Sequence, residues 1–293
     1  MRKPNLFIVG APKSGTTALT TYLGQHPGVF APSKKEPHFF GSDLHKKVLY
    51  PKTEDEYLSY YQASGDVAYA LDSSVTYLAS QNAAKEIRTF EPRAKIIIML
   101  RHPVDMLYSW HSQLLFGLFE NIEDFGKALA AENQRKSGKN IPKTAYLVEN
   151  LFYRDMARYP EQVTRYLDEF GREQVKIILF DDFCRDVGQV WGEILEFLGL
   201  EALDSVDLKP VNSNTRWRSQ LLQRYLRAFP NNDLARDIIL PPPLRWRVER
   251  FNTVRTKRPP MNSQLRAELQ GEYEPQIRAL QKLIDRDLTA WLN

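Results

Sequence analysis

Three continuous apolar runs dominate the hydrophobic pattern of this chain, and each predicts a buried strand. They cover 6–9, 94–100 and 175–180, and few polar residues interrupt them. Unbroken apolar runs bounded by turn residues are typical of strands that are covered on both faces. A fourth and weaker run, at 67–71, predicts one more strand.

Helical patterns separate these strands. We expect one helix at 18–23 and one from Pro103, because proline suits the first turn of a helix. A further helix passes through 191–198, and helical stretches lie across 146–170. Strands that alternate with helices favour an α/β fold, in which helices flank a central, mostly parallel sheet.

The end of the chain shows one candidate boundary. Three consecutive prolines occupy 241–243, and the residues at 261–293 look like a single helical tail. Such a tail has little to fold around, so we expect it to pack back onto the rest. The sequence therefore predicts one domain that spans 1–293.

Composition adds only mild constraints. The chain has 293 residues and a net charge of +4, which is compatible with an anionic ligand but does not require one. The one cysteine, Cys184, excludes an intrachain disulfide, and we expect a buried or neutral thiol in a strand-to-helix connection. No apolar run is long enough for a signal peptide or a membrane span. We expect a cytoplasmic protein with no nucleic-acid partner.

A glycine-rich loop follows the first predicted strand and opens the first helix. It begins at Gly10, and Lys13, Gly15, Thr16 and Thr17 supply a cation, a close backbone approach and two hydroxyls. Backbone N–H groups at a helix N-terminus bind phosphate or sulfate, because they are unpaired and carry partial positive charge. The context therefore predicts an anion site.

The loop is not a standard nucleotide-hydrolysing loop. Gly10 and Gly15 have the spacing of a Walker A motif, but Thr16 occupies the lysine position and the lysine has moved to Lys13. A P-loop kinase or NTPase is thus one alternative, and a non-catalytic nucleotide-binding module is another. The displaced lysine argues against the first of these.

The run Pro12-Lys13-Ser14-Gly15-Thr16-Thr17 resembles the 5′-phosphosulfate loop of sulfotransferases that use 3′-phosphoadenosine 5′-phosphosulfate (PAPS). The resemblance implies a single-domain fold like that of the P-loop NTPases, with PAPS as co-substrate and 3′-phosphoadenosine 5′-phosphate (PAP) as product. It implies that 13–17 bind the phosphosulfate and that Lys13 stabilises charge on the leaving phosphate, as a cation would. It implies no metal, and no His/Cys/Asp cluster has the spacing of metal ligands.

Two further segments resemble the same family. Arg101 follows the strongest strand and Ser109 lies on the next helix, which resembles the family's 3′-phosphate motif. Lys257 and Arg258 resemble part of a late loop that closes over the co-substrate, although the glycine of that loop is absent. The resemblance implies that all four residues contact phosphate.

The candidate base lies in the segment Lys34-Lys35-Glu36-Pro37-His38-Phe39-Phe40. It resembles a Lys-Glu-x-x-Phe-Phe segment of the heparan sulfate branch and its bacterial relatives, in which the glutamate deprotonates the acceptor. Glu36 is therefore the first candidate, and a partly dry cleft would raise its pKa toward a useful value. His38 is the rival, because an unperturbed imidazole titrates near neutrality.

One segment departs from the heparan branch. That branch carries a Glu-Lys-Ser/Thr-Pro-x-Tyr pattern where this chain has Asp72-Ser73-Ser74-Val75-Thr76-Tyr77, so the role of its lysine cannot be transferred. We expect Asp72 to cap the next helix, with a hydrogen bond to the acceptor as the alternative. We expect the acceptor to be a hydroxyl or amine of a saccharide or small molecule. Five aromatic side chains could line the acceptor cleft or belong to the core instead: Phe39, Phe40, Tyr77, Trp110 and Phe116.

Overall fold

A computed structural model describes residues 2–45, 50–203, 206–209, 215–219, 222–223, 247–248, 250–255 and 258–292. Its centre is a five-stranded sheet in the order β2-β3-β1-β4-β5, in which every neighbouring pair is parallel. The strands are β1 (Leu6–Gly10), β2 (Val29–Phe30), β3 (Tyr69–Asp72), β4 (Lys95–Leu100) and β5 (Val175–Leu179). A two-stranded antiparallel sheet pairs β6 (Thr215–Trp217) with β7 (Thr253–Arg255).

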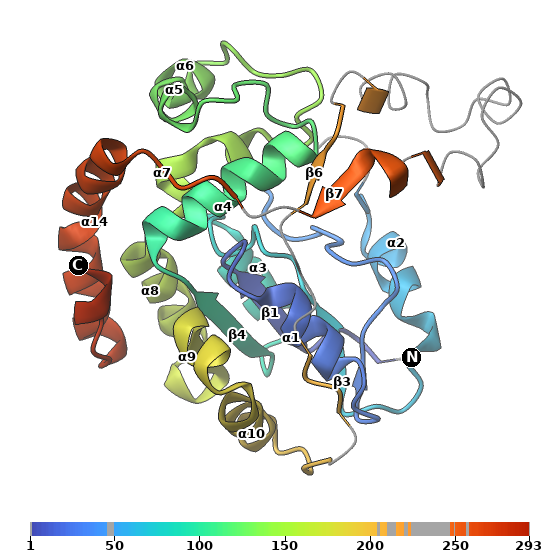
Figure 1. The fold of residues 1–293 in the computed structure, drawn as a ribbon. Coiled ribbons are helices and arrows are strands. Elements are labelled where there is room, and N and C mark those ends of the chain that lie inside the picture. Colours follow the sequence, from blue (N-terminus) through green and yellow to red (C-terminus); the bar gives the residue numbers. More distant parts are fainter. Residues whose placement is uncertain are drawn as a thin grey trace, which may run out of the picture.

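Helices cover both faces of the large sheet (Figure 1). The α-helices are α1 (Thr16–Leu23), α2 (Glu54–Leu58), α3 (Ala83–Phe90), α4 (Pro103–Phe116), α5 (Phe125–Ala130), α6 (Glu132–Lys136), α7 (Tyr153–Met156), α8 (Tyr159–Phe170), α9 (Phe180–Arg185), α10 (Val187–Leu198) and α14 (Ser263–Ile284). Short 3₁₀ helices are η1 (Ser59–Ser64), η2 (Val148–Leu151), η3 (Arg172–Gln174) and η4 (Thr289–Trp291).

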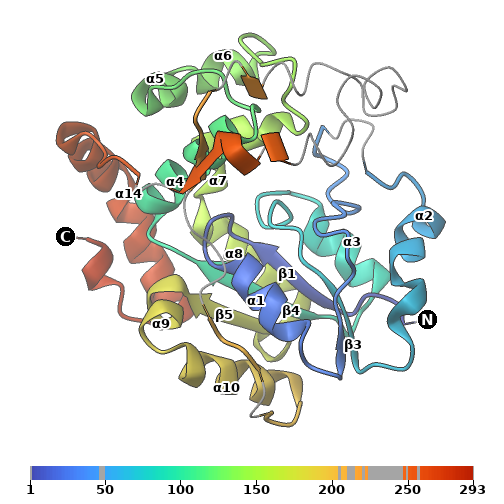
Figure 2. The ribbon, with the colours of Figure 1, turned by 45° about the vertical axis from the view of Figure 1, so that its right-hand side comes forward.

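The sheet separates two hydrophobic layers, because successive side chains of a strand point to opposite faces. Leu6 and Ile8 of β1 pack with α1, α9 and α10, whereas Phe7 and Val9 pack with α3, α4, α8 and α14. Figure 2 shows α14 along the outside of α4 and α8, and these helices are in contact. The predicted tail therefore packs back onto the domain, and the prediction of a single α/β domain around a parallel sheet is confirmed.

Several local predictions need correction. The helical stretches expected across 146–170 are η2, α7 and α8 in succession, but the two-residue strand β2 was missed. Cys184 lies within α9 and is exposed, so it does not have the buried position that we allowed for. Burial of part of the side chain still raises the pKa of its thiol and favours the neutral form. The candidate boundary at 241–243 lies outside the described residues.

The prediction that Asp72 caps a helix is also wrong. Asp72 is the last residue of β3 and its side chain is fully buried, while the N-cap of the following helix α3 is Asn82. A carboxylate in that position has no helix N-terminus to cap. Its partners are the hydroxyl groups described below.

A buried ion pair anchors the turn after α4. Glu120 accepts two hydrogen bonds from Arg135, each of 2.7 Å, and a third of 2.7 Å from the Tyr153 hydroxyl. Neither charged side chain is exposed to solvent. Glu120 also accepts from the backbone N–H groups of Asn121 and Ile122, so the pair fixes the residues that follow α4.

We therefore expect Arg135→Met to lower the free energy of unfolding by roughly 3–5 kcal/mol, because Glu120 would keep an uncompensated buried charge. Denaturant unfolding measures this change. The control is Arg278→Met, which removes an exposed pair with Glu274 and should cost about 0–1 kcal/mol. Equal losses in the two variants would contradict the assignment of Glu120 and Arg135 as a structural pair.

Candidate active site

The glycine-rich loop lies at the carboxyl end of the central strand β1, where ligands of open α/β sheets bind. A Cβ atom at Gly10 would lie 2.7 Å from Leu78 Cβ and 2.8 Å from the Val75 carbonyl oxygen, so the turn needs glycine. Gly15 is the N-cap of α1 at φ 91°, and no side chain caps this helix. The first N–H groups of α1 are thus available to an anion, as the sequence predicted.

Lys13 lies within this loop and is close to several other positively charged side chains. Its ammonium donates a hydrogen bond to Gln113 Oε1 on α4, at 3.1 Å. Burial lowers the pKa of Lys13 to about 8, and the neighbouring charges of Arg258, Arg101 and Lys35 act in the same direction. An anion would relieve this repulsion and restore the ordinary protonation of the lysine.

Arg101, at the end of β4, is tied directly to the loop. Its Nη1 donates to the backbone carbonyl of Lys13 at 3.2 Å, and its guanidinium lies over the Phe180 ring, 4.7 Å from the centroid. Both contacts hold the arginine beside the anion site. The residues that make these contacts follow the carboxyl ends of β1, β4 and β5, which meet at one edge of the sheet.

Arg258 brings the end of the chain to the same edge. Its Nη2 donates to the Ser109 hydroxyl at 3.0 Å, and it lies 5.4 Å from the centroid of the Tyr108 ring. The Tyr108 hydroxyl in turn donates to the Pro259 carbonyl at 3.1 Å. The segment that contains Arg258 is therefore fastened to α4 at the position of Ser109.

Glu36 is joined to both a cation and an imidazole. Its Oε1 is 3.5 Å from Lys35 Nζ, and its Oε2 is 3.3 Å from His38 Nε2. Lys35 also donates to the Thr17 hydroxyl at 2.6 Å, so this lysine connects the candidate base to the loop. The Glu36 side chain is 31% exposed, whereas that of His38 is 2% exposed.

Buried hydroxyl groups fix His38 from behind. Its Nδ1 is 2.7 Å from Thr76 Oγ1, and its backbone N–H donates to Ser74 Oγ at 3.1 Å. Ser74 then donates to Asp72 at 2.7 Å, and the hydroxyls of Tyr57 and Tyr77 donate to the same carboxylate at 2.8 and 3.0 Å. Burial raises the pKa of Asp72 even though these three donors favour its charged form.

The electrostatics of Glu36 differ from the expectation. Burial alone would raise the pKa of Glu36, but the hydrogen bond and charge of His38, followed by those of Lys35, outweigh burial and lower it. The expected upward shift is therefore wrong for the protein without ligand. The carboxyl group is ionised at neutral pH and can accept a proton.

Aromatic side chains from distant segments surround this carboxylate. The ring of Tyr50 lies 4.9 Å from that of His38 and 6.1 Å from that of Tyr146, which lies 4.3 Å from Phe119. Burial and then the charge of Glu36 raise the pKa of Tyr146. All three of these aromatic residues are partly exposed and could contact an acceptor.

Three of the five aromatic residues that the sequence offered for a cleft lie in the core. Phe40, Tyr77 and Trp110 belong to the buried core. Phe39 stacks on Tyr57 with a centroid separation of 4.5 Å, and Phe116 stacks on Trp217 at 4.2 Å. The sequence left open a cleft or the core, and the core is correct for Phe40, Tyr77 and Trp110.

The structure brings most of the predicted residues to one edge of the sheet: Lys13, Ser14, Gly15, Thr16, Thr17, Glu36, His38, Arg101, Ser109 and Arg258. Lys257 lies outside the described residues. Two contacts were missed, those of Lys35 and Gln113. Gln113 was detectable, because it lies four residues after Ser109 on the same face of α4.

Ser73 occupies the position of the lysine that is absent from this chain. It is buried, and its Oγ accepts a hydrogen bond of 2.8 Å from Thr20 of α1. The residue after β3 therefore supports α1 instead of supplying a charge.

Comparison with known proteins identifies the family. The model of the sulfotransferase domain matches residues 3–230. The chain belongs to the sulfotransferase domain family. A sulfotransferase from Alicyclobacillus acidocaldarius is 30% identical and has a TM-score of 0.76, with 100% of both chains covered. The family and this fold confirm the predicted enzyme class, a transferase of sulfuryl groups.

Curated relatives include much longer proteins. Bifunctional heparan sulfate N-deacetylase/N-sulfotransferase 1 of Caenorhabditis elegans is 33% identical over 203 residues, which are 67% of this chain and 22% of that protein. Human N-deacetylase/N-sulfotransferase 3 is 25% identical over 210 residues, 68% of this chain and 22% of that protein. This sulfotransferase thus matches about a fifth of the length of these relatives.

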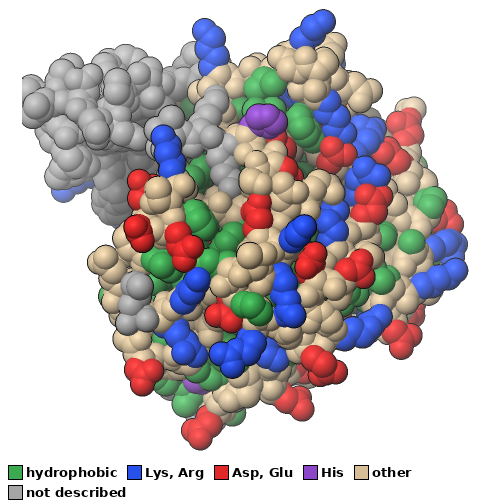
Figure 3. Space-filling model, turned by 180° about the vertical axis from the view of Figure 1, so that it is seen from behind, with side chains coloured by type: hydrophobic (Ala, Val, Ile, Leu, Met, Phe, Trp, Pro, Cys, Tyr) green, Lys and Arg blue, Asp and Glu red, His purple; other side chains and the backbone are tan. Residues whose placement is uncertain are grey.

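Other features of the described part of the sulfotransferase bear on possible partners. On the face seen in Figure 3, Lys and Arg alternate with Asp and Glu and form no continuous basic patch. In the described residues, no helix combines the length and apolar character that crossing a bilayer requires. Nor do those residues contain a group of three or more His, Cys, Asp or Glu placed to hold a metal ion.

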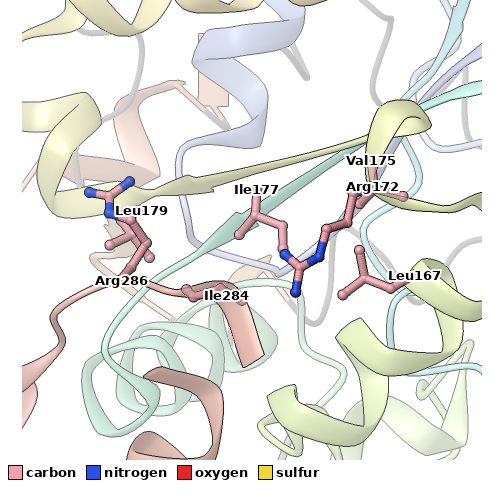
Figure 4. Close-up of a pocket in the computed structure, with 7 residues that line it drawn as sticks. All are labelled: Leu167, Arg172, Val175, Ile177, Leu179, Ile284 and Arg286. Atoms are coloured by element: carbon pink, nitrogen blue, oxygen red, sulfur yellow. The ribbon is translucent and has the colours of Figure 1, made fainter. Parts of the chain in front are cut away.

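A separate cavity of about 200 Å³ lies beside edge strand β5 (Figure 4). Its two arginines already have partners, since Arg172 donates to the Leu283 carbonyl at 2.8 Å and Arg286 pairs with Asp182 at 2.5 Å. The other lining residues are apolar: Leu167, Val175, Ile177, Leu179 and Ile284. None of the residues predicted for catalysis or binding lines this cavity.

We expect Lys13 to titrate near pH 8 in the sulfotransferase without ligand. NMR of ¹³C-methylated lysines measures this pKa, with Lys13→Arg to assign the signal. Arg258→Ala should move the pKa upward, because it removes the charge that contributes most after burial. Arg278→Ala, far along α14, should leave it unchanged. A Lys13 signal that titrates with the other lysines would contradict the described crowding of charge.

Proposed function

We propose that this sulfotransferase transfers a sulfuryl group from PAPS to a hydroxyl or amine by in-line displacement. The observation that carries the proposal is the meeting of two cationic groups at one sheet edge. Lys13 and Lys35 stand at the N-terminus of α1, and Arg258 donates to Ser109 on α4. Arg101 donates to the Lys13 carbonyl and acts by its charge on both Lys13 and Arg258. A doubly phosphorylated adenosine presents an anion at each end and suits such a pair.

The loop would hold the 5′-phosphosulfate. The uncapped N–H groups at the start of α1, with the hydroxyls of Thr16 and Thr17, can donate to its oxygens. Lys13 would stabilise the charge that develops on the 5′-phosphate oxygen as its bond to sulfur breaks. Gly15 lets the backbone approach, since it has no side chain and adopts a left-handed conformation. Ser14, which is buried beside it in the loop, is proposed to contact the same group.

Arg101, Ser109 and Arg258 would hold the 3′-phosphate. A guanidinium offers paired N–H donors that fit phosphate oxygens. Ser109 already binds Arg258, so a phosphate arriving there meets a preformed donor group. Lys257 is also proposed to contact phosphate, on the resemblance of its segment alone.

Glu36 is the proposed base, in preference to His38. Glu36 is the more exposed of the two, and both ring nitrogens of His38 already have partners. Glu36 would take the proton from the acceptor as its oxygen or nitrogen bonds to sulfur, and the 5′-phosphate of PAP would leave with the electron pair. His38 would hold the carboxylate in place. The proposed chemistry requires no metal.

The acceptor is proposed to be a saccharide or a small molecule. The names of the curated relatives specify heparan sulfate, and Tyr50, Phe119 and Tyr146 offer rings beside Glu36 on which a sugar or an apolar group could pack. We further propose that one domain takes in 1–293, since α14 is part of the core, and that the protein is cytoplasmic.

We expect PAP to bind at least about tenfold more tightly than AMP, because charge-assisted hydrogen bonds to the 3′-phosphate contribute roughly 1.5–3 kcal/mol each. Arg101→Ala should weaken PAP by roughly 10- to 100-fold and leave AMP nearly unchanged. Calorimetry measures both ligands. Equal affinity for PAP and AMP in the wild type would remove the basis for PAPS, and preference for ATP with Mg²⁺ would favour a kinase or NTPase.

We expect Glu36→Gln to lower turnover with labelled PAPS by about 10²–10⁴-fold and to preserve PAP affinity. Lys13→Ala should reduce both. The transfer product is detected by mass across a panel of saccharide and small-molecule acceptors. Full turnover in Glu36→Gln would exclude it as the base, and donor binding without transfer to any acceptor would favour the non-catalytic module.

A further inference from the structure

One ammonium group is shared between the phosphosulfate loop and the candidate base. Lys35 Nζ lies 2.6 Å from Thr17 Oγ1, on the first turn of α1, and 3.5 Å from Glu36 Oε1. The side chain of Lys35 is 30% exposed, so it is not locked by burial. A group that touches both partners can respond to a ligand at either of them.

In the protein without ligand, Glu36 serves as a counter-ion. Four charges act on Lys13: Arg258, Arg101 and Lys35 are cations, and Glu36 is the one anion among them. The carboxylate therefore stabilises the crowded cations before any donor arrives. PAPS would bring several anionic oxygens to the same place and take over this part.

We propose that Lys35 couples donor binding to activation of the base. Without PAPS, Lys35 pairs with Glu36; when PAPS binds, its ammonium turns toward the sulfuryl oxygens beside Thr17 and releases the carboxylate. This inference rests on the proposed function. Lys35 is thus a positioning residue for Glu36 in the free protein and contacts the donor in the complex.

The side-chain chemistry of lysine permits this exchange. Its ammonium has three donors on a flexible stem, so it can leave one acceptor for another nearby. The Thr17 hydroxyl accepts from Lys35 in the free protein, and it would be able to donate to the sulfuryl group once Lys35 turns. Deprotonation of the acceptor would then become favourable only when the sulfuryl group is present.

Release of Lys35 has a definite effect on Glu36. The groups that face the carboxylate are Lys35, His38, Lys13 and the phenols of Tyr50 and Tyr146. Loss of the Lys35 partner leaves burial less opposed, so the pKa of Glu36 rises and the carboxyl takes up part of a proton on PAPS binding. Lys13, with a pKa of about 8, is mostly protonated below pH 7, so its contribution is smallest at the acid end of this range.

Proton uptake on PAPS binding tests the proposal. Calorimetry between pH 5 and 7, in buffers of different ionisation enthalpy, measures it for wild type, Lys35→Met, Glu36→Gln and the double variant. The protons of the ligand itself cancel in each comparison with and without Glu36. We expect Glu36→Gln to lower uptake by a fraction of one proton in the presence of Lys35, and to have a clearly smaller effect in the Lys35→Met background, where only the charge of PAPS acts on Glu36.

Lys34→Met is the matched control. Lys34 precedes Lys35, but its ammonium donates to the Tyr60 hydroxyl at 2.6 Å. The effect of Glu36→Gln should be the same in this background as in wild type. Thermal unfolding of each variant establishes that it is folded. If Lys35→Met does not fold, Lys35→Gln provides a second substitution at the same position.

Each outcome decides between two statements. The role of Lys35 is overturned if Glu36→Gln has an equal effect with and without Lys35, or no effect in the wild-type background. In both cases, binding of PAPS would still support PAPS as the donor. Failure of the wild type to bind PAPS at all would instead contradict the proposed function. A loss of proton uptake on Glu36→Gln that is clearly larger with Lys35 than without it supports the inference.

Discussion

The site depends on the gathering of four cations beside the N-terminus of one helix. The four cations are Lys13, Lys35, Arg101 and Arg258. Burial, followed by the charges of the other three, lowers the pKa of Lys13 to about 8. Like charges in a partly dry site repel, so the free protein holds an arrangement that only an anion makes favourable. The two hydrophobic layers around the sheet supply the stability that keeps these charges in place.

The backbone around the site is held in uncommon conformations as well. Lys13, Glu36 and His38 have positive φ angles of 59°, 57° and 49°, in the left-handed region that few non-glycine residues adopt. Such conformations persist where surrounding structure enforces them. For the segment of Glu36 and His38, this support comes from Asp72. Asp72 accepts from the hydroxyls of Ser74 and Tyr77, and these hydroxyls in turn accept from the backbone N–H groups of His38 and Phe40. A fully buried carboxylate at a strand end thus shapes the segment that carries the base.

This arrangement explains which parts of the structure could be predicted. Strands β1, β4 and β5 were readable because burial on both faces leaves continuous apolar runs, and the loop was readable because its residues are consecutive. The strand β2 has two residues, and its pairing with β3 decides its conformation. Tyr50 and Tyr146 lie near each other only in the fold, so no local pattern marks them. Lys35 is adjacent to Glu36, yet the left-handed turn at Glu36 determines that its ammonium reaches Thr17.

The choice between two neighbouring bases follows from burial and not from intrinsic pKa. His38 is the better base by its ordinary titration range, but its side chain is 2% exposed and its ring nitrogens face Thr76 and Glu36. The Glu36 carboxylate is the more exposed of the two groups, and the buried imidazole of His38 contacts it from the protein interior. This contact keeps Glu36 ionised and oriented. A carboxylate stabilised in this way is a weak base, because the hydrogen bond of His38 and the charge of Lys35 favour its ionised form. Its strength rises at the moment of reaction if one of those partners is drawn away. Of the two groups in contact with it, Lys35 also touches the loop where the sulfuryl group would lie.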